Sequence, residues 1–457
     1  MAMGRGGPMG QGQRPSMRAA LVVFKYPVYR QLWVSSAFAF TGMQMLMVAR
    51  ALLAWELTHS FTAIGTISLA FGLPMLAFSL VGGAVADRVD KRNLTLVTNT
   101  LIGVLAVATA VMVATDTMTF EILFIVGLMQ GTLSALGMPA RTPLMAEVVG
   151  PENMMSAIAM SNTAMNGTRL FGPALAGVIA GAWGMEWAYV AQAVAYVLAT
   201  LTMLTVPSGL GAAARANRAP SNVLKEIGGG LSYVTRNSTL RLLMGMMFIT
   251  TFFAMPYVML MAGFVQRDLG QSKEAFGWIQ SISGIGALAG SLAIATVATF
   301  DRKPLLQWLS GILGGGGLIL MAVLSGPFGF GGAIVATLVL GLFLTAYQTL
   351  NSTMIMDAAE PQYYGRVMSI NMLTFSAMPI MAAPLGIVAD QIGASTLFIL
   401  QGSMVVGFLI LVAVLNPKYT FGRQAPRVFE GGMPTPQPGG RPSAAGGGYA
   451  GVSARRP

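Results

Sequence analysis

The chain contains no cysteine and a single histidine, His59. The lack of cysteine excludes disulfides, thiolate catalysis and thiolate-bound metals. One histidine leaves too few ligands for a zinc or iron enzyme, so no metal and no other cofactor is expected. His59 is interpreted as a solvated loop residue rather than as a proton-carrying site.

Charge is also scarce. Only 9% of the residues are charged, whereas a typical soluble domain has about 25%. Hydrophobic residues make up 54% of the chain, and the mean hydropathy is +0.67. This composition indicates a polytopic membrane protein. A membrane enzyme would need acids, histidines or metal ligands clustered at one face, which the sequence lacks, so no enzymatic activity is expected.

Twelve hydrophobic stretches are long enough to cross a bilayer, because a spanning helix needs about 20 largely apolar residues. The predicted fold class is therefore an all-α polytopic membrane protein with 12 transmembrane helices. The stretches cover approximately residues 31–54, 63–86, 95–115, 120–139, 155–181, 185–206, 241–264, 275–299, 305–325, 330–352, 367–389 and 395–415.

The distribution of lysine and arginine predicts the orientation. With both termini in the cytoplasm, cytoplasmic segments carry 23 of the 27 cations and outer loops carry 2. Cations collect on the cytoplasmic side of membrane proteins, so this topology accounts for the net charge of +11. The expected partner of the basic segments is the lipid bilayer, whose cytoplasmic leaflet is anionic. Nucleic acid is not expected, because no aromatic residues are interleaved with the basic N-terminal tail.

The second half of the chain repeats the first. The segment 138–162 returns as 350–372, with Glu147 matching Asp357 at a distance of 210 residues. Parallel six-span halves are typical of one class of secondary transporter, which holds its substrate near the midplane between the halves. The expected domains are a basic tail (1–28), an N-terminal six-helix half (29–206), a cytoplasmic linker (207–240), a C-terminal six-helix half (241–417) and a disordered cytoplasmic tail (418–457).

A charged loop, GGAVADRVDKR at residues 82–92, separates the second and third stretches. It resembles the major facilitator superfamily signature G-x-L-A-D-R-x-G-R-[KR], although Val85 replaces the usual Leu and Asp90 the usual Gly. The stretches 29–42, 53–65, 139–149 and 169–177 resemble the enterobactin-exporter-like and macrolide-efflux-like branch. The resemblance implies alternating access and efflux of a small molecule, usually driven by protons.

Two residues differ from the family pattern and weaken the inference, drawn from this resemblance, that transport is coupled to protons. Gly127 stands where many proton-coupled drug exporters have an arginine, and Met43 stands where many members of the branch have an aspartate. The pair Gly172-Pro173 in the fifth stretch resembles the Gly-Pro signature of exporters and modestly favours export over import. The same proline also has a structural interpretation, as a helix kink.

Polar residues inside the spans are the candidates for substrate binding, since an arginine at a span centre costs about 2.5–3.5 kcal/mol on translocon scales. Each candidate also has a structural interpretation, either as a cap on backbone carbonyls or as a bridge between helices. A substrate that meets the two arginines is expected to be anionic or rich in carbonyls. The candidates are Arg50, Gln130, Asn166, Arg169 and Gln280.

Charged residues at the span ends are the candidates for gating and coupling. A cytoplasmic cluster can bias a two-state equilibrium even though single surface pairs are weak. The gating candidates are Gly83, Asp87, Arg88, Lys91, Arg92, Arg141, Glu147, Asp357 and Arg366. Glu56 and Asp390, at outer span ends, are the candidate proton carriers, unless the coupling proton travels on the substrate.

The sequence thus predicts a secondary active transporter in the cell (inner or plasma) membrane, acting as a monomer. Proton-driven efflux of a drug-like or siderophore-like compound is the favoured function. An importer of the same fold and a non-transporting membrane sensor are the alternatives. A sensor would carry an added signalling domain, whereas the C-terminal tail is only rich in glycine and proline.

Overall fold

The computed structural model describes residues 21–150, 153–209, 223–296, 302–360, 363, 366–367, 370–371, 374 and 378–421. These residues are almost all helical, and none of them forms a strand. Nine helices in this described part are long and apolar enough to cross a membrane. The fold is therefore the all-α membrane type that the composition predicts.

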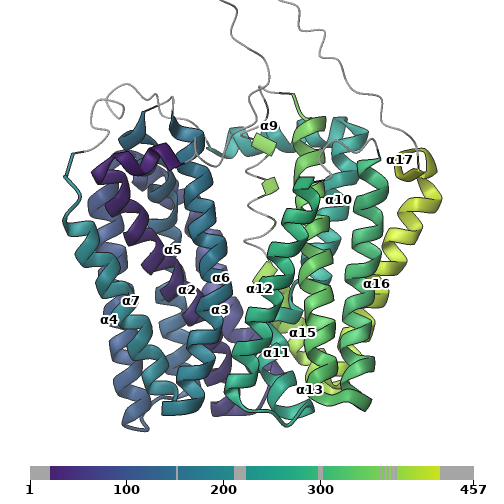
Figure 1. The fold of residues 1–457 in the computed structure, drawn as a ribbon, viewed down its shortest axis with the longest axis horizontal. Helices are drawn as coiled ribbons and strands as arrows, with labels where there is room; N and C mark the ends of the chain where they lie inside the picture. Colours follow the sequence, from purple (N-terminus) through teal and green to yellow (C-terminus); the bar gives the residue numbers. More distant parts are fainter. Residues whose placement is uncertain are drawn as a thin grey trace, which may run out of the picture.

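The first group of helices packs around α2, at the left of Figure 1. It follows a short 3₁₀ helix, η1 (Leu21–Lys25). The group consists of α2 (Pro27–Thr58), α3 (Phe61–Arg88), α4 (Lys91–Ala114), α5 (Phe120–Val149), α6 (Met154–Trp183) and α7 (Met185–Leu204).

The second group packs around α13, at the right of Figure 1, and α9 (Val223–Arg236) precedes it. A π-helical turn, η3 (Phe264–Asp268), ends its first span. The remaining members are α10 (Ser238–Phe253), α11 (Tyr257–Gly263), α12 (Lys273–Thr296), α13 (Lys303–Ala358), α15 (Met378–Ile392), α16 (Ala394–Leu415) and α17 (Pro417–Phe421).

The 56 residues of α13 are two helices joined at a kink. Gly329 has φ 51° and ψ −132°, which lies outside the helical region and favours glycine. Pro327, two residues earlier, cannot donate the helical hydrogen bond. The kink falls between the hydrophobic stretches 305–325 and 330–352, so α13 matches two predicted spans.

Local signals in the sequence set the helix ends. The side chains of Ser60, Asp90, Thr119 and Asn237 each accept a hydrogen bond from the backbone of the helix that follows. Such N-caps satisfy amide groups that have no partner within the helix. These four caps therefore mark where α3, α4, α5 and α10 begin.

Two ends of the molecule follow from this arrangement. The basic end carries η1, the α3–α4 loop, α9 and α17, which lie together at the top of Figure 1. The distal end carries the turns at 59–60, 115–119, 269–272 and 393. Helix α2 runs from the basic end to the distal end, which gives the depth of each residue along it.

Candidate functional site

The two helix groups meet mainly along two pairs of helices, α3 with α15 and α6 with α12, and α11 also contacts α2 and α3. Glycines make these contacts close. A Cβ at Gly65 of α3 would collide with the backbone of Ala382 in α15, and Gly177 of α6 faces Gly277 of α12 with room for neither Cβ. Small residues let helix backbones approach in this way.

The contact between the groups covers the distal part of the spans. On α3 it runs from Phe61, beside Gly386, to Gly72, beside Pro379. Phe61 and Gly72 are 11 helical steps apart, which is about 16 Å at the helical rise of 1.5 Å per residue. A bilayer core is about 30 Å thick, so the interlocked region covers roughly the distal half of it.

Asp390 of α15 joins the groups at the distal end. Its carboxylate accepts hydrogen bonds from the backbone N–H groups of Phe61 (2.8 Å) and Thr62 (2.9 Å) and from the hydroxyl of Ser60 (2.6 Å). Phe61 and Thr62 are the first residues of α3, where unpaired N–H groups and the helix dipole favour a negative charge. A carboxylate from one group therefore caps a helix of the other.

A second polar contact crosses between the groups nearby. Glu56, near the end of α2, forms an ion pair with Lys273, the first residue of α12. Arg267 of η3 lies over the ring of Phe61, with 5.6 Å between its guanidinium carbon and the ring centroid. Both predicted proton carriers, Glu56 and Asp390, thus contact the other group at the distal end; titration of either remains a prediction.

At the basic end, two ion pairs between described residues each lie within one group. Lys91, only 2% exposed, pairs with Glu147 at 2.5 Å inside the first group. Lys303 pairs with Asp357 at 2.8 Å inside the second. The two pairs occupy matching positions of the internal repeat, which the spacing of Glu147 and Asp357 indicates in the sequence.

The other gating candidates also have local partners or open surroundings. Arg92 donates to the carbonyls of Leu204 and Val206 and so caps the end of α7. Arg141 donates to Asn99 at 2.7 Å. Arg366 lies over the ring of Tyr363 and beside α9. Arg88 is exposed, a Cβ at Gly83 would meet no atom within 4 Å, and the side chain of Asp87 lies outside the described part.

A cavity of about 20 Å³ lies between the groups, beyond the middle of the spans toward the distal end. Arg50 of α2 and Gln280 of α12 face each other across it and are 7% and 8% exposed. Phe71 packs on the guanidinium of Arg50, whose carbon lies 4.4 Å from the ring centroid. Two predicted binding residues from opposite halves of the chain are thus brought together.

The remaining binding candidates lie elsewhere. Gln130 of α5 is buried, and its side-chain nitrogen has no hydrogen-bond partner in the described structure. The side chain of Arg169 is exposed, and its backbone lies against Gly284 of α12. The side chain of Asn166 lies outside the described part.

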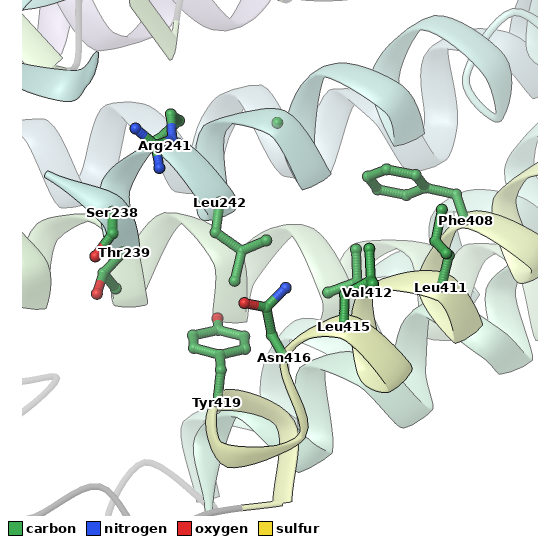
Figure 2. A pocket seen from close by; sticks show the side chains of 11 residues that line it. Ser238, Thr239, Arg241, Leu242, Phe408, Leu411, Val412, Leu415, Asn416 and Tyr419 are labelled. Atoms are coloured by element: carbon green, nitrogen blue, oxygen red, sulfur yellow. The ribbon is translucent and has the colours of Figure 1, made fainter. Parts of the chain in front are cut away.

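A larger cavity, of about 470 Å³, lies away from the boundary between the groups, among α10, α16 and α17 (Figure 2). Its wall is apolar along Phe408, Leu411 and Leu415, and Arg241 and Asn416 lie at its basic end. Residues from the first group do not line it. This cavity therefore does not lie between the two groups, although it is the larger of the two.

Comparison with known proteins identifies the family. The family model described as transmembrane secretion effector, of the major facilitator superfamily (MFS), matches residues 18–430. The chain belongs to this MFS family. It is therefore a membrane transporter of the efflux type and not an enzyme.

Relatives of this chain include the staphyloferrin A transporter of Staphylococcus aureus, which is 23% identical over 79% of this chain and 89% of the relative. Macrolide efflux protein A of Streptococcus pyogenes is 24% identical over 84% of this chain and 95% of the relative. The enterobactin exporter EntS of Salmonella paratyphi A is 24% identical over 40% of this chain and 44% of the relative. The resemblance seen in the sequence is confirmed.

Solved MFS structures share the fold. A bacterial homologue of the human lysosomal transporter Spinster, in an inward-facing and unoccupied conformation, superposes with a TM-score of 0.67 at 13% identity, covering 88% of this chain and 99% of that chain. The nucleoside transporter NupG superposes with a TM-score of 0.65 at 17% identity, covering 86% and 98%.

Three contact residues were not singled out from the sequence. Ser60 and Lys273 hold the distal end, and Phe71 covers Arg50. Ser60 has a sequence signal, since a serine directly before an apolar helix is a preferred N-cap. Lys273 and Phe71 have none, because their roles depend on which helices become neighbours.

Proposed function

We propose that the protein is a secondary active exporter that works by alternating access, with 12 spans in two six-helix halves. Helices α2–α7 are the first half and α10–α16 the second, in which α13 supplies two spans. The expected domain limits follow, with residues 1–28 and 418–457 as tails and 207–240 as the linker.

The asymmetry of closure carries this proposal. Described polar contacts between the halves gather at the distal end, where Asp390 caps α3 and Glu56 pairs with Lys273. At the basic end, the described ion pairs stay inside each half. Because few polar contacts close the distal end, the protein can change to the opposite state, which is open at the distal end and closed at the basic end. In that state the gating candidates at the basic end would contact one another across the halves.

The orientation is part of the proposal. Both termini and the basic end face the cytoplasm of the cell membrane, because 23 of the 27 cations belong to these segments. The described state is then closed to the outside. The lipid bilayer is the expected partner, no nucleic acid is involved, and the protein acts as a monomer.

Proton coupling is proposed to act through the distal contacts. Protonation of Asp390 or Glu56 removes the negative charge that holds α3 or Lys273, and this weakens closure from the outer, acidic side. The substrate is proposed to be a drug-like or siderophore-like compound, since relatives are described as transporting staphyloferrin A and macrolides.

The test is transport in proteoliposomes under an imposed pH gradient. Wild type, Glu56→Gln, Asp390→Asn and the double variant are compared, with counterflow as a gradient-independent readout. Lost gradient-driven flux with retained counterflow supports carboxylate coupling. Wild-type coupling in the double variant excludes both residues. Net accumulation of a compound in the import direction favours an importer of the same fold. A lack of flux for every compound favours a non-transporting sensor.

A further inference from the structure

We propose that the cavity beside Arg50 binds the negative group of a transported amphiphilic organic anion. Arg50 would serve as the counter-ion and Gln280 as a second hydrogen-bond donor from the opposite half. The inference rests on the proposed transport function and names the substrate class for that function.

The charge of Arg50 is not balanced within the described part of the protein. Its side chain is 7% exposed, and the described residues provide it with neither an ion pair nor a hydrogen bond. Its buried Nη1 atom has no partner. Glu56, six residues further along α2, is already paired with Lys273. Stacking on Phe71 recovers only part of the cost of burying a charge.

A structural arginine would look different. Guanidinium groups that stabilise a fold donate to carboxylates or carbonyls, as the half-buried Arg92 does at the end of α7. Arg50 instead lines a cavity between the two groups, and its buried Nη1 atom has no hydrogen-bond partner. An anionic ligand would supply the missing charge, and the planar guanidinium suits the two oxygens of a carboxylate.

The lining of the cavity indicates the rest of the ligand. Met47, Met259, Val258 and Phe276 provide soft apolar and aromatic surface around the charge. Methionine adapts to ligands of varied shape. The cavity, at about 20 Å³, accommodates one water-sized group in this state. A whole ligand would therefore enter only when the halves separate, and the apolar lining would then contact a hydrophobic body beside the charged group.

The position of the cavity links binding to closure. Arg50 and Ser68 belong to the first half, whereas Phe276 and Gln280 belong to the second. The contacts between α6 and α12 hold these walls together at the distal end. Opening that end would separate Gln280 from Arg50, so the anion would lose one of its donors at the moment of release to the outside.

The experiment uses matched acids and uncharged amides as probes. These are indole-3-acetate with indole-3-acetamide, 1-naphthoate with 1-naphthamide, and salicylate with salicylamide; erythromycin is the large non-anionic probe. Probe-induced shifts in Tm are measured on the purified full chain, and counterflow in proteoliposomes. Variants are Arg50→Gln, Arg50→Lys and the control Arg30→Gln, which changes an exposed arginine at the basic end of the same helix.

Wild type and Arg30→Gln should prefer an acid over its amide at least about 10-fold, as charge-assisted hydrogen bonds imply. Arg50→Gln should abolish the preference and Arg50→Lys should keep part of it. Without any probe, Arg50→Gln should have the wild-type Tm or a higher one, since it removes an unpaired buried charge. A structural arginine would lower it.

Contrary results separate the two proposals. An acid preference that survives in Arg50→Gln, or a lowered Tm with the preference intact, overturns the anion site. Counterflow of erythromycin or of amides without binding of any acid also overturns it and leaves export standing. If no probe produces counterflow or a Tm shift, the proposed function fails and the anion site fails with it.

Discussion

Replacing Asp390 by asparagine should open the distal end. Asparagine keeps one acceptor oxygen for α3 but loses the charge and the second acceptor oxygen, so one of the three hydrogen bonds is lost and the rest become neutral. Hydrogen bonds to charged groups contribute about 1.5–3 kcal/mol, and neutral ones about 0.5–1.5. With the helix-dipole term of about 0.3–1 kcal/mol, these ranges sum to about 4–7 kcal/mol for a site without solvent. Asp390 is only half-buried, so solvent screens the interaction, and closure should weaken by about 2 kcal/mol, or about 30-fold in population.

Paired spin labels measure this shift, and the absence of native cysteine makes their placement simple. Labels at Thr117 and Gln271 report the distance between the halves at the distal end, and both side chains are exposed. Labels at Thr205 and Asn416 report the basic end. In Asp390→Asn, the distal distance should lengthen and the basic-end distance should shorten.

Asp116→Asn is the matched control. It removes an exposed carboxylate at the same end, and asparagine tolerates the positive φ of 53° found there. Distances in this variant should equal those of wild type. If Asp390→Asn gives the same distances as the control, the cap does not hold the distal end closed and the reasoning fails.

Acidification should act like the Asp390→Asn change. The ionised carboxylate accepts all three hydrogen bonds, so closure is favoured at high pH and weakens as the carboxylate is protonated. The other titratable groups at this end are unchanged in the variant; they include Glu56, His59, Asp116, Glu121, Glu186, Arg267, Asp268, Lys273 and Glu274. The difference between wild type and Asp390→Asn therefore isolates the contribution of Asp390.

Three further predictions concern packing, ion pairs and orientation. Gly277→Leu should prevent closure of α6 on α12, so that transport is lost and distal labels stay far apart; normal transport would contradict the close contact. Glu147→Gln should lower the free energy of unfolding by about 3–5 kcal/mol, because its lysine partner is buried. Asp357→Asn, in the exposed pair, should lower it by only about 0–1 kcal/mol. Equal losses of the two variants in thermal unfolding would refute this. In cells, Thr117→Cys should react with an impermeant thiol reagent and Ser208→Cys should not, and the opposite pattern would reverse the orientation.

The spans were predictable because a bilayer imposes a length on apolar segments. The stretch 185–206 corresponds to α7 (Met185–Leu204), and 395–415 corresponds to α16 (Ala394–Leu415). The single long α13 was not predicted, because helical geometry continues on both sides of the Gly329 kink. Hydropathy shows where the chain is apolar, but it does not show whether two neighbouring spans form one continuous helix.

The partners of the charged residues were not predictable in the same way. Asp390 was singled out by its position at a span end, but its partners are backbone N–H groups of a helix about 330 residues earlier in the chain. Every residue except proline has the same backbone N–H group, so the sequence does not show which of these groups will bind a carboxylate. The contact between α3 and α15 arises only in the tertiary structure. Arg50 stands out as a charge within a span, whereas its juxtaposition with Gln280 depends on how the two halves meet.

The glycine contacts between the halves also set how the conformational equilibrium responds to heat. Closure through Gly65, Gly177 and Gly277 lets buried apolar side chains of both halves pack into one cluster, among them Ile64 and Phe276. The heat-capacity change of a transition follows the apolar area that it buries. The change between open and closed states should thus carry a heat-capacity change, and the logarithm of its equilibrium constant should curve when plotted against inverse temperature. The balance between the two states of such an exporter therefore depends on temperature.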